Sequence, residues 1–167
     1  MATGRSNKLV GQTGEYLVAA ELSRQGYIAT TFTGNVPDYD IIASSAHGKH
    51  VSVQVKASSG SSWQFGDMTR FFEISFSGKR QIVGRPKECP VQRLVMVFVA
   101  IDPKGDDRFY VLAWRTLRNI LRENHQAYLA SHDGMRPKKW DSLHGAILEK
   151  DLRPHLNKWR VIKQCLA

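Results

Sequence analysis

The sequence contains few of the residues and segments that mark secreted, metal-binding or membrane proteins. Among its 167 residues are only two cysteines, Cys89 and Cys165, and their spacing fits neither a metal-binding nor a redox motif. No apolar run approaches the roughly 20 residues of a membrane-spanning helix, and the first residues lack the apolar core of a secretory signal. We therefore expect a soluble cytoplasmic protein with reduced cysteines.

Motifs of several common enzyme classes are also missing. The six histidines include no His-Glu-x-x-His pair, which argues against a zinc hydrolase. No glycine-rich phosphate loop of the form Gly-x-x-x-x-Gly-Lys-Ser/Thr occurs, so nucleotide hydrolysis is not indicated. Neither cysteine lies in a motif that suggests a nucleophile.

Acidic residues are the scarcer of the two charge types. There are 15 Asp and Glu against 24 Lys and Arg, which gives a net charge of +9 and a pI near 9.8. This balance favours a polyanionic partner such as nucleic acid or acidic lipid. A binder of anionic membranes would need an amphipathic basic helix with a continuous apolar face, and residues 156–166 are too short and mixed for one. We expect a DNA-associated protein.

The composition allows one substantial hydrophobic core. The chain is 42% hydrophobic, and it shows no internal repeat and no linker long enough to separate domains. We predict a single domain over residues 1–167, with a basic helical extension from about residue 133. Short helices are expected in this extension, within residues 143–152 and 154–166.

The hydrophobic pattern predicts an α/β fold. Apolar residues at helical spacing favour a helix over residues 8–25, ended by Gly26, and a second helix over residues 116–131. The run at 94–101 is unbroken, as expected for a central strand covered on both faces. Further strands are predicted at 27–33, 39–43, 50–58, 71–76 and 109–114.

Two segments between the predicted strands are expected to be surface loops. Residues 59–70 carry Trp63 and Phe65, whose rings either contact a DNA branch or groove or fold over the core. Residues 78–93 are irregular and basic, and they either contact phosphates or form an ordinary solvated loop. The basic residues of this second loop are Lys79, Arg80, Arg85, Lys87 and Arg93.

Polar residues gather where two of the predicted strands meet. Asp40 directly precedes the apolar run 41–43, at the mouth of a strand. Residues 51–58 alternate between apolar and polar, which places Gln54 and Lys56 on one face. If the two strands form an antiparallel hairpin, Asp40 lies beside Gln54 and Lys56, because paired side chains stand about 5 Å apart.

Glu15 adds a second carboxylate from the first helix. Its helical angle is within about 60° of Val18 and Leu22, so it lies on the apolar face. A charged group there needs a partner, and Glu15 either pairs with a lysine or joins the polar cluster. Two carboxylates, an amide and an ammonium suit phosphodiester hydrolysis assisted by Mg²⁺, with Mn²⁺ as the alternative metal.

The order of these residues resembles the motif of the PD-(D/E)xK nuclease superfamily. That family has a restriction-endonuclease-like αβββαβ core, with a mixed central sheet flanked by helices. The chain is similar in this order to archaeal Holliday-junction resolvases and to PD-(D/E)xK homing endonucleases. The matching stretches are Gly14-Glu15, Pro37-Asp38-Tyr39-Asp40-Ile41-Ile42 and Val53-Gln54-Val55-Lys56.

The resemblance implies a role for each matching residue. Asp40 would be the central metal ligand, Glu15 a supporting metal carboxylate, and Lys56 the catalytic lysine. The backbone carbonyl of Val55 would be a further metal ligand. Gln54 stands where the pattern usually has Asp or Glu, so its amide oxygen either binds the metal more weakly or marks lost activity.

The position of the central aspartate has two candidates. Pro37-Asp38 is the literal Pro-Asp pair, whereas Asp40 immediately precedes the apolar strand and is the preferred ligand. Asp38 would then support the metal ligands or simply belong to the turn.

These features predict a Mg²⁺-dependent DNA endonuclease of the junction-resolving, homing or restriction type. Because one small domain carries one site, cutting two strands would need a homodimer or homotetramer. The alternative is a catalytically weak or inactive DNA-binding relative, with Gln54 as the mark of decay.

Overall fold

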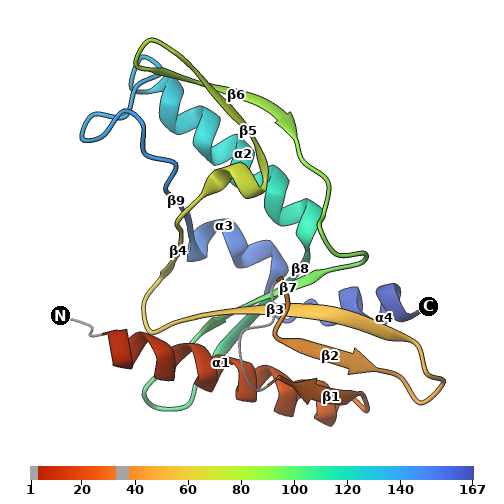
Figure 1. Cartoon of the computed structure of the whole chain (residues 1–167). Coiled ribbons are helices and arrows are strands. Elements are labelled where there is room, and N and C mark those ends of the chain that lie inside the picture. Colours follow the sequence, from red (N-terminus) through yellow and green to blue (C-terminus); the bar gives the residue numbers. More distant parts are fainter. Residues whose placement is uncertain (1–3, 33–37) are drawn as a thin grey trace.

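The computed structural model describes residues 4–32 and 38–167. The predicted turn residues Gly34, Asn35 and Pro37, and the last residue of the predicted strand 27–33, lie outside the described residues. A five-stranded sheet forms the centre of the molecule, in the order β1-β2-β3-β7-β8 (Figure 1). Its strands are β1 (Ile28–Thr31), β2 (Ile41–Ser44), β3 (His50–Ser58), β7 (Val95–Ala100) and β8 (Arg108–Ala113).

The central sheet is mixed. β3 and β7 run parallel, whereas the other neighbouring strands are antiparallel. β7 is buried along its whole length, as its unbroken apolar run predicts. The predicted α/β class, a mixed sheet flanked by helices, is confirmed.

One face of the sheet is covered by two helices from opposite ends of the chain. They are α1 (Gly4–Arg24), which lies along β3 in Figure 1, and α4 (Arg160–Leu166). Val18 and Leu22 of α1 are fully buried against the valines of the sheet. Gly26 follows the helix with a φ of +85°, so the predicted helix end is confirmed.

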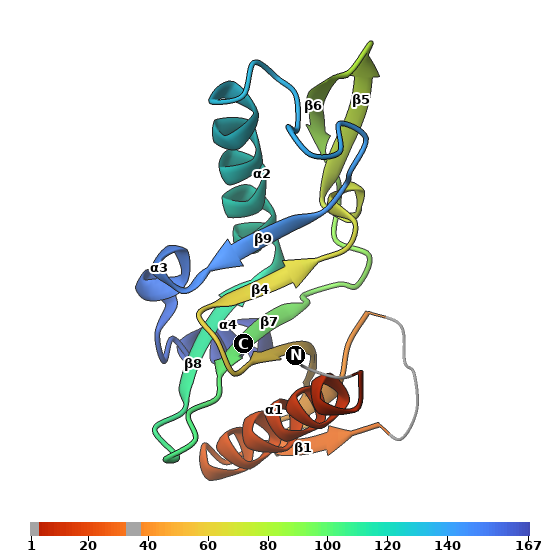
Figure 2. The same cartoon turned by 90° about the vertical axis from the view of Figure 1, so that its left-hand side faces the viewer.

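The other face is covered by segments that are far apart in the sequence. β4 (Ser62–Phe65) and β9 (Gly145–Leu148) pair antiparallel across it (Figure 2). A hairpin of β5 (Phe72–Ser77) and β6 (Arg80–Pro86) stands beside α2 (Trp114–Ala130), beyond this ribbon. The remaining elements are η1 (Met68–Arg70), α3 (Glu149–Leu152) and η2 (Arg153–His155), where η marks a 3₁₀ turn.

The prediction of a surface loop over residues 59–70 is wrong. Trp63 lies in β4 and is only 3% exposed, with its ring centre 5.5 Å from that of Phe98 and 6.1 Å from that of Tyr110. Phe65, on the same face of β4, is also buried. Both rings therefore fold over the core, because burying large aromatic surface is the dominant favourable contribution to packing here.

Two other segments differ from prediction. One pairs in a hairpin with an irregular register, and the other pairs with a strand that is distant in the sequence. Residues 78–93, predicted to be irregular, contain β6, which pairs with β5. Residues 143–152, predicted to be helical, begin with β9 before the short α3. At Gly145, a Cβ atom would lie 2.4 Å from the Sδ of Met68, so a side chain there would collide with the core.

Cys89 and Cys165 are both free and half-buried in the structure. None of the helices in the described ranges is long and apolar enough to cross a membrane. The cellular location of the protein stays a prediction.

Candidate active site

The predicted hairpin that brings Asp40 towards Gln54 and Lys56 is present, because β2 pairs antiparallel with β3. Asp40 lies just before β2, and its backbone N–H donates to the carbonyl of Val53 in β3 at 2.9 Å. Its carboxylate oxygen Oδ2 accepts a hydrogen bond from the N–H of Val55 at 2.7 Å. The carboxylate is thus anchored at the edge of β3.

Glu15 approaches Asp40 from helix α1. The helix contacts β3 so closely at Gly14 that a Cβ atom there would lie 2.4 Å from the Cβ of Ala57. Burial raises the pKa of Glu15, and the negative charge of Asp40 raises it further. The carboxylates of Glu15 and Asp40 therefore lie within electrostatic range of each other.

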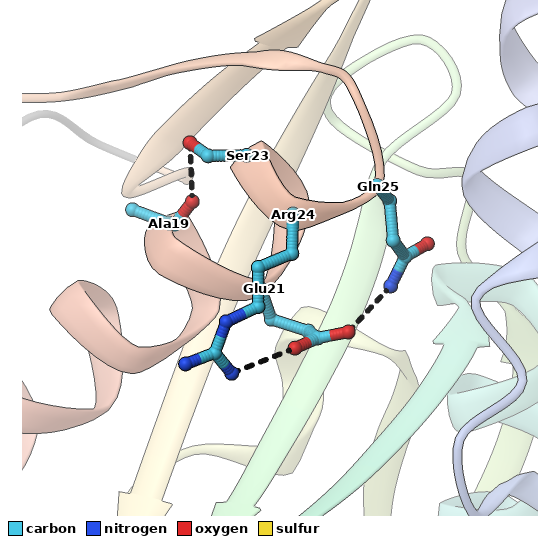
Figure 3. Close-up of polar contacts among 5 residues, drawn as sticks. All are labelled: Ala19, Glu21, Ser23, Arg24 and Gln25. Carbon is cyan, nitrogen blue, oxygen red and sulfur yellow. Dashed lines mark hydrogen bonds and ion pairs between the residues drawn. The ribbon is translucent and has the colours of Figure 1, made fainter.

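Glu21 shows how an ordinary surface glutamate of the same helix behaves. Its carboxylate accepts a hydrogen bond from Gln25 at 3.0 Å and lies 3.4 Å from the guanidinium of Arg24 (Figure 3). Cationic and amide donors thus satisfy Glu21 locally. Glu15 differs because the charged group that shifts its pKa is another carboxylate.

Lys56 is near enough to Asp40 to lower its pKa, and its Nζ lies 4.8 Å from the ring centre of Phe65. Burial lowers the pKa of Lys56, the positive charge of Arg70 lowers it further, and Asp40 opposes the shift. For Asp40, burial raises the pKa more than its backbone hydrogen bond and Lys56 lower it. Asp40 therefore couples electrostatically to both Glu15 and Lys56.

A cavity of about 270 Å³ opens on the Lys56 side of β3. Gln54 and Lys56 line it from β3, and Arg70 lines it from η1. Arg70 also donates to Oδ1 of Asp38 at 2.8 Å, and Asp38 has a left-handed φ of +75°. The two candidate aspartates thus have different neighbours: Asp38 binds an arginine, and Asp40 lies near a carboxylate and a lysine.

The donor set is compatible with a divalent cation. Within residues 4–32 and 38–167, no three His, Cys, Asp or Glu side chains lie together in a way that could hold a metal. A metal at this place would therefore have two charged ligands, Glu15 and Asp40. Their raised pKa values reflect burial, and for Glu15 also repulsion, that a cation would offset. Mg²⁺ keeps several waters and needs few protein ligands, so the amide of Gln54 and the carbonyl of Val55 can complete the set.

The basic residues predicted to contact DNA lie at separate places. Lys79 and Arg80 are at the tip of the β5–β6 hairpin, which projects from the body of the molecule in Figure 1. Arg85 is near the end of β6, and Lys87 follows that strand. Arg93 donates to a backbone carbonyl of α4 at 3.0 Å. The hairpin tip is therefore separate from the basic residues nearer the sheet.

Two side chains around Lys56 were not foreseen from the sequence. Phe65 and Arg70 both lie in the segment that was predicted to be a surface loop. The two-residue spacing of Trp63 and Phe65 is typical of a strand and was the available signal. No local pattern marks Arg70, because its approach to Lys56 depends on how the segment from β3 to β7 folds back.

Comparisons with known proteins agree with this architecture. No known protein-family profile matches the chain, and no curated protein matches its sequence. The bacterial homing endonuclease I-Ssp6803I superposes with a TM-score of 0.50 at 15% identity, over 95% of this chain and 94% of that one. The Holliday junction resolvase Hjc of Archaeoglobus fulgidus gives a TM-score of 0.48 at 15% identity, over 92% and 95% of the two chains. The chain therefore has the restriction-endonuclease-like fold of the homing endonuclease, as its resemblance to PD-(D/E)xK nucleases predicted.

Proposed function

We propose that the chain is a metal-dependent DNA endonuclease of the junction-resolving or homing type, including mobile-element enzymes. The observation that carries this proposal is the placement of Asp40, which the N–H of Val55 holds beside β3 in the neighbourhood of both Glu15 and Lys56. Perturbed carboxylates beside a lysine of lowered pKa are a recurrent feature of active sites. The fold shared with a homing endonuclease supports the same reaction class.

The metal would be held by the carboxylates of Glu15 and Asp40, with the Gln54 amide and the Val55 carbonyl as further ligands. Mg²⁺ is the proposed ion, and Mn²⁺ would suit the same oxygen donors. When bound, the ion would lower the pKa of a coordinated water and neutralise charge on the phosphate. The hydrogen bond from the Val55 N–H holds Asp40 in a fixed orientation at this point.

Lys56 is proposed to take a direct part in hydrolysis. Its lowered pKa brings the side chain closer to the pH range in which it exchanges a proton. In its charged form it stabilises the negative charge that develops on the phosphate. In its neutral form it would accept a proton from the attacking water, which forms the new bond to phosphorus while the P–O bond to the sugar breaks and the departing sugar oxygen takes a proton from solvent.

Double-stranded or branched DNA is the proposed partner. The tip of the β5–β6 hairpin combines Lys79 and Arg80 with the ring of Phe76, which packs edge-on against Trp140 at 5.6 Å. Both of these rings are 41% exposed. Basic side chains attract phosphates and exposed aromatic rings stack on bases, so this tip is suited to contact DNA outside the cleavage site.

The active assembly is proposed to be a homodimer or homotetramer. Each chain provides one Asp40-centred site, and cutting both strands of a duplex, or a symmetric pair of strands at a junction, needs two such sites. Closed symmetric assemblies supply paired sites at a fixed spacing.

The second candidate function is that of a DNA-binding relative with weak or no catalysis. Gln54 in place of a carboxylate favours it, because the described part of the chain then offers the metal only Glu15 and Asp40 as charged ligands. Lower ligand charge weakens the hold on a divalent cation.

A cleavage assay separates the two functions. Wild type is expected to cut linear duplex or four-way-junction DNA with Mg²⁺ or Mn²⁺ and to stop in EDTA. Lys56→Ala is expected to bind DNA but to cut at least about a hundredfold more slowly, because it loses a proton-transfer and charge-stabilising group. If wild type and Lys56→Ala both bind DNA and neither cuts, the enzyme proposal is lost and the DNA-binding relative remains.

The hairpin tip is tested by the salt dependence of DNA affinity. A Lys79→Ala/Arg80→Ala double variant removes two phosphate contacts, so the slope of log affinity against log salt is expected to fall by about 1.8, or 0.9 for each contact. Lys104→Ala, an exposed lysine in the turn after β7, serves as the control and should leave the slope unchanged. Equal slopes for the double variant and wild type would remove the hairpin from the DNA interface.

A further inference from the structure

The cavity beside Lys56 has a composition that the metal site alone does not explain. Its floor is apolar and aromatic, and it includes the buried side chains of Phe71, Leu94 and Trp114. Its rim carries two cations, Lys56 from β3 and Arg70 from η1. The lining also includes the carboxylates of Asp38 and Asp67, so what the two cations offer a ligand depends on the contacts that these carboxylates already make.

The acidic residues on the same rim already have partners. Asp38 accepts a hydrogen bond from Arg70 at 2.8 Å. Asp67 caps η1, where its Oδ1 accepts hydrogen bonds from the backbone N–H of Thr69 at 2.8 Å and from its hydroxyl at 2.6 Å. Neither carboxylate is therefore needed to bind a cationic ligand, and the rim is suited to an anion.

Arg70 has donors to spare for that anion. The structure shows its guanidinium donating to Asp38 through one nitrogen, and the side chain is 58% exposed. A guanidinium presents five N–H donors in a planar fork that matches two oxygens of a phosphate. Arg70 can therefore keep its bond to Asp38 while its remaining N–H groups bind a ligand.

We propose that Arg70 and Lys56 together bind a phosphodiester of the DNA backbone at this cavity, and that Asp38 positions Arg70 for this contact. The identity of the ligand as DNA rests on the proposed nuclease function. Asp38 is two residues from Asp40, so the Arg70–Asp38 pair links the bound phosphate to the segment that carries the metal carboxylate. This arrangement gives Asp38, the aspartate of the Pro-Asp pair, a task distinct from metal binding.

The contact is measured first without cleavage, by fluorescence anisotropy of labelled duplex and junction DNA in EDTA. Arg70→Ala is expected to bind about tenfold more weakly, because it loses a charge-assisted hydrogen bond. Its log–log salt slope should fall by about 0.9, as expected for one phosphate contact. Arg24→Ala is the matched control, because Arg24 also pairs with a carboxylate, that of Glu21, but far from the cavity at the surface of α1. It should behave as wild type.

Asp38 is tested by a different readout. Asp38→Ala keeps both cations, so its salt slope is expected to equal that of wild type, while single-turnover cleavage slows by about tenfold because Arg70 is no longer held in place. Thermal denaturation of each variant checks that the fold is retained, as expected for partly exposed side chains. An Asp38→Ala variant that cleaves at the wild-type rate would remove its positioning role.

The outcomes distinguish this subsite from the nuclease function itself. If wild type fails to cut DNA but Arg70→Ala still loses affinity and slope, the phosphate subsite stands and the enzyme proposal fails. If Arg70→Ala binds DNA as wild type does, the subsite is refuted even when cleavage occurs. Inorganic phosphate is the second probe. Its binding is monitored by tryptophan fluorescence, because Trp114 lines the cavity. A phosphate response that depends on Arg70, combined with unchanged DNA binding, would assign the cavity to a free anion and overturn the proposal.

Discussion

Asp40→Asn is expected to cleave DNA about a thousandfold more slowly than wild type in Mg²⁺, a loss of about 4 kcal/mol of transition-state stabilisation. The substitution removes one of only two carboxylates available to the metal in the described chain, while Asn can still accept the hydrogen bond from the Val55 N–H. DNA affinity in EDTA should stay close to that of wild type. Single-turnover cleavage and anisotropy on the same DNA measure the two effects separately.

Although Asp40→Asn is expected to slow cleavage, it is expected to make the metal-free protein more stable. Burial raises the pKa of Asp40 in the folded protein above its ordinary value of 3.8. Stability from such a group is fully present below its unfolded pKa and is lost as the pH rises through its folded pKa. At neutral pH and without metal, the ionised carboxylate is therefore destabilising, and Asp40→Asn should raise rather than lower the Tm.

With a divalent cation bound, wild type should have the higher Tm of the two proteins. A divalent cation that binds only the folded protein raises the Tm of wild type, and Asp40→Asn should lose most of this rise. Glu21→Gln is the matched control, because Glu21 is bound to Arg24 and Gln25 at the surface and should leave both cleavage and the metal-induced rise intact. An Asp40→Asn variant that gains as much Tm from Mg²⁺ as wild type would contradict the assignment of Asp40 as a metal ligand.

Gly14→Ala is expected to destabilise the protein by about 1–3 kcal/mol, the usual cost of overpacking a tight contact. The new Cβ would lie 2.4 Å from the Cβ of Ala57, so helix α1 must move away from β3. Because Glu15 is the next residue, this movement shifts its carboxylate relative to Asp40. A displacement of about 1 Å can cost about a hundredfold in rate, and we expect a loss of that size in single-turnover cleavage.

Two further variants test the physical cause. Gly11→Ala, in the same helix but with nothing within 4 Å of the added Cβ, should stabilise the protein by about 0.5–1 kcal/mol because alanine favours a helix. Ala57→Gly removes the atom that collides, so Gly14→Ala should cost far less in an Ala57→Gly background than alone. Denaturant unfolding of the four members of this cycle measures the coupling. Additive effects would show that the helix–strand contact at Gly14 is not the cause.

The elements that local patterns predicted best are those around Asp40. The alternation of residues 51–58 indicated β3 and the common face of Gln54 and Lys56, and the antiparallel pairing with β2 follows from a short turn. Helical periodicity likewise put Glu15 on the side of its helix that faces the sheet. These relations involve residues that are neighbours in a turn or in one regular element, so sequence spacing determines them.

The segment from β3 to β7 was predicted poorly for a different reason. β4 is a strand because it pairs with β9, about eighty positions later, and Ser and Gly around Trp63 suggested a loop when that partner was unknown. Arg70 reaches the cavity only because this crossover packs on the aromatic core and returns η1 to the sheet. Neither contact has a local signature.

The sequence by itself determined the five strands of the central sheet, the long helices α1 and α2, and the basic charge. It also gave the set Glu15, Asp40, Gln54 and Lys56 as candidates for one site. Only the tertiary structure decided which aspartate lies beside Glu15 and Lys56, and which one pairs with Arg70. The physical reason is range: propensity and periodicity act within a few residues, whereas these charge contacts form only when segments tens of residues apart bury their apolar faces together.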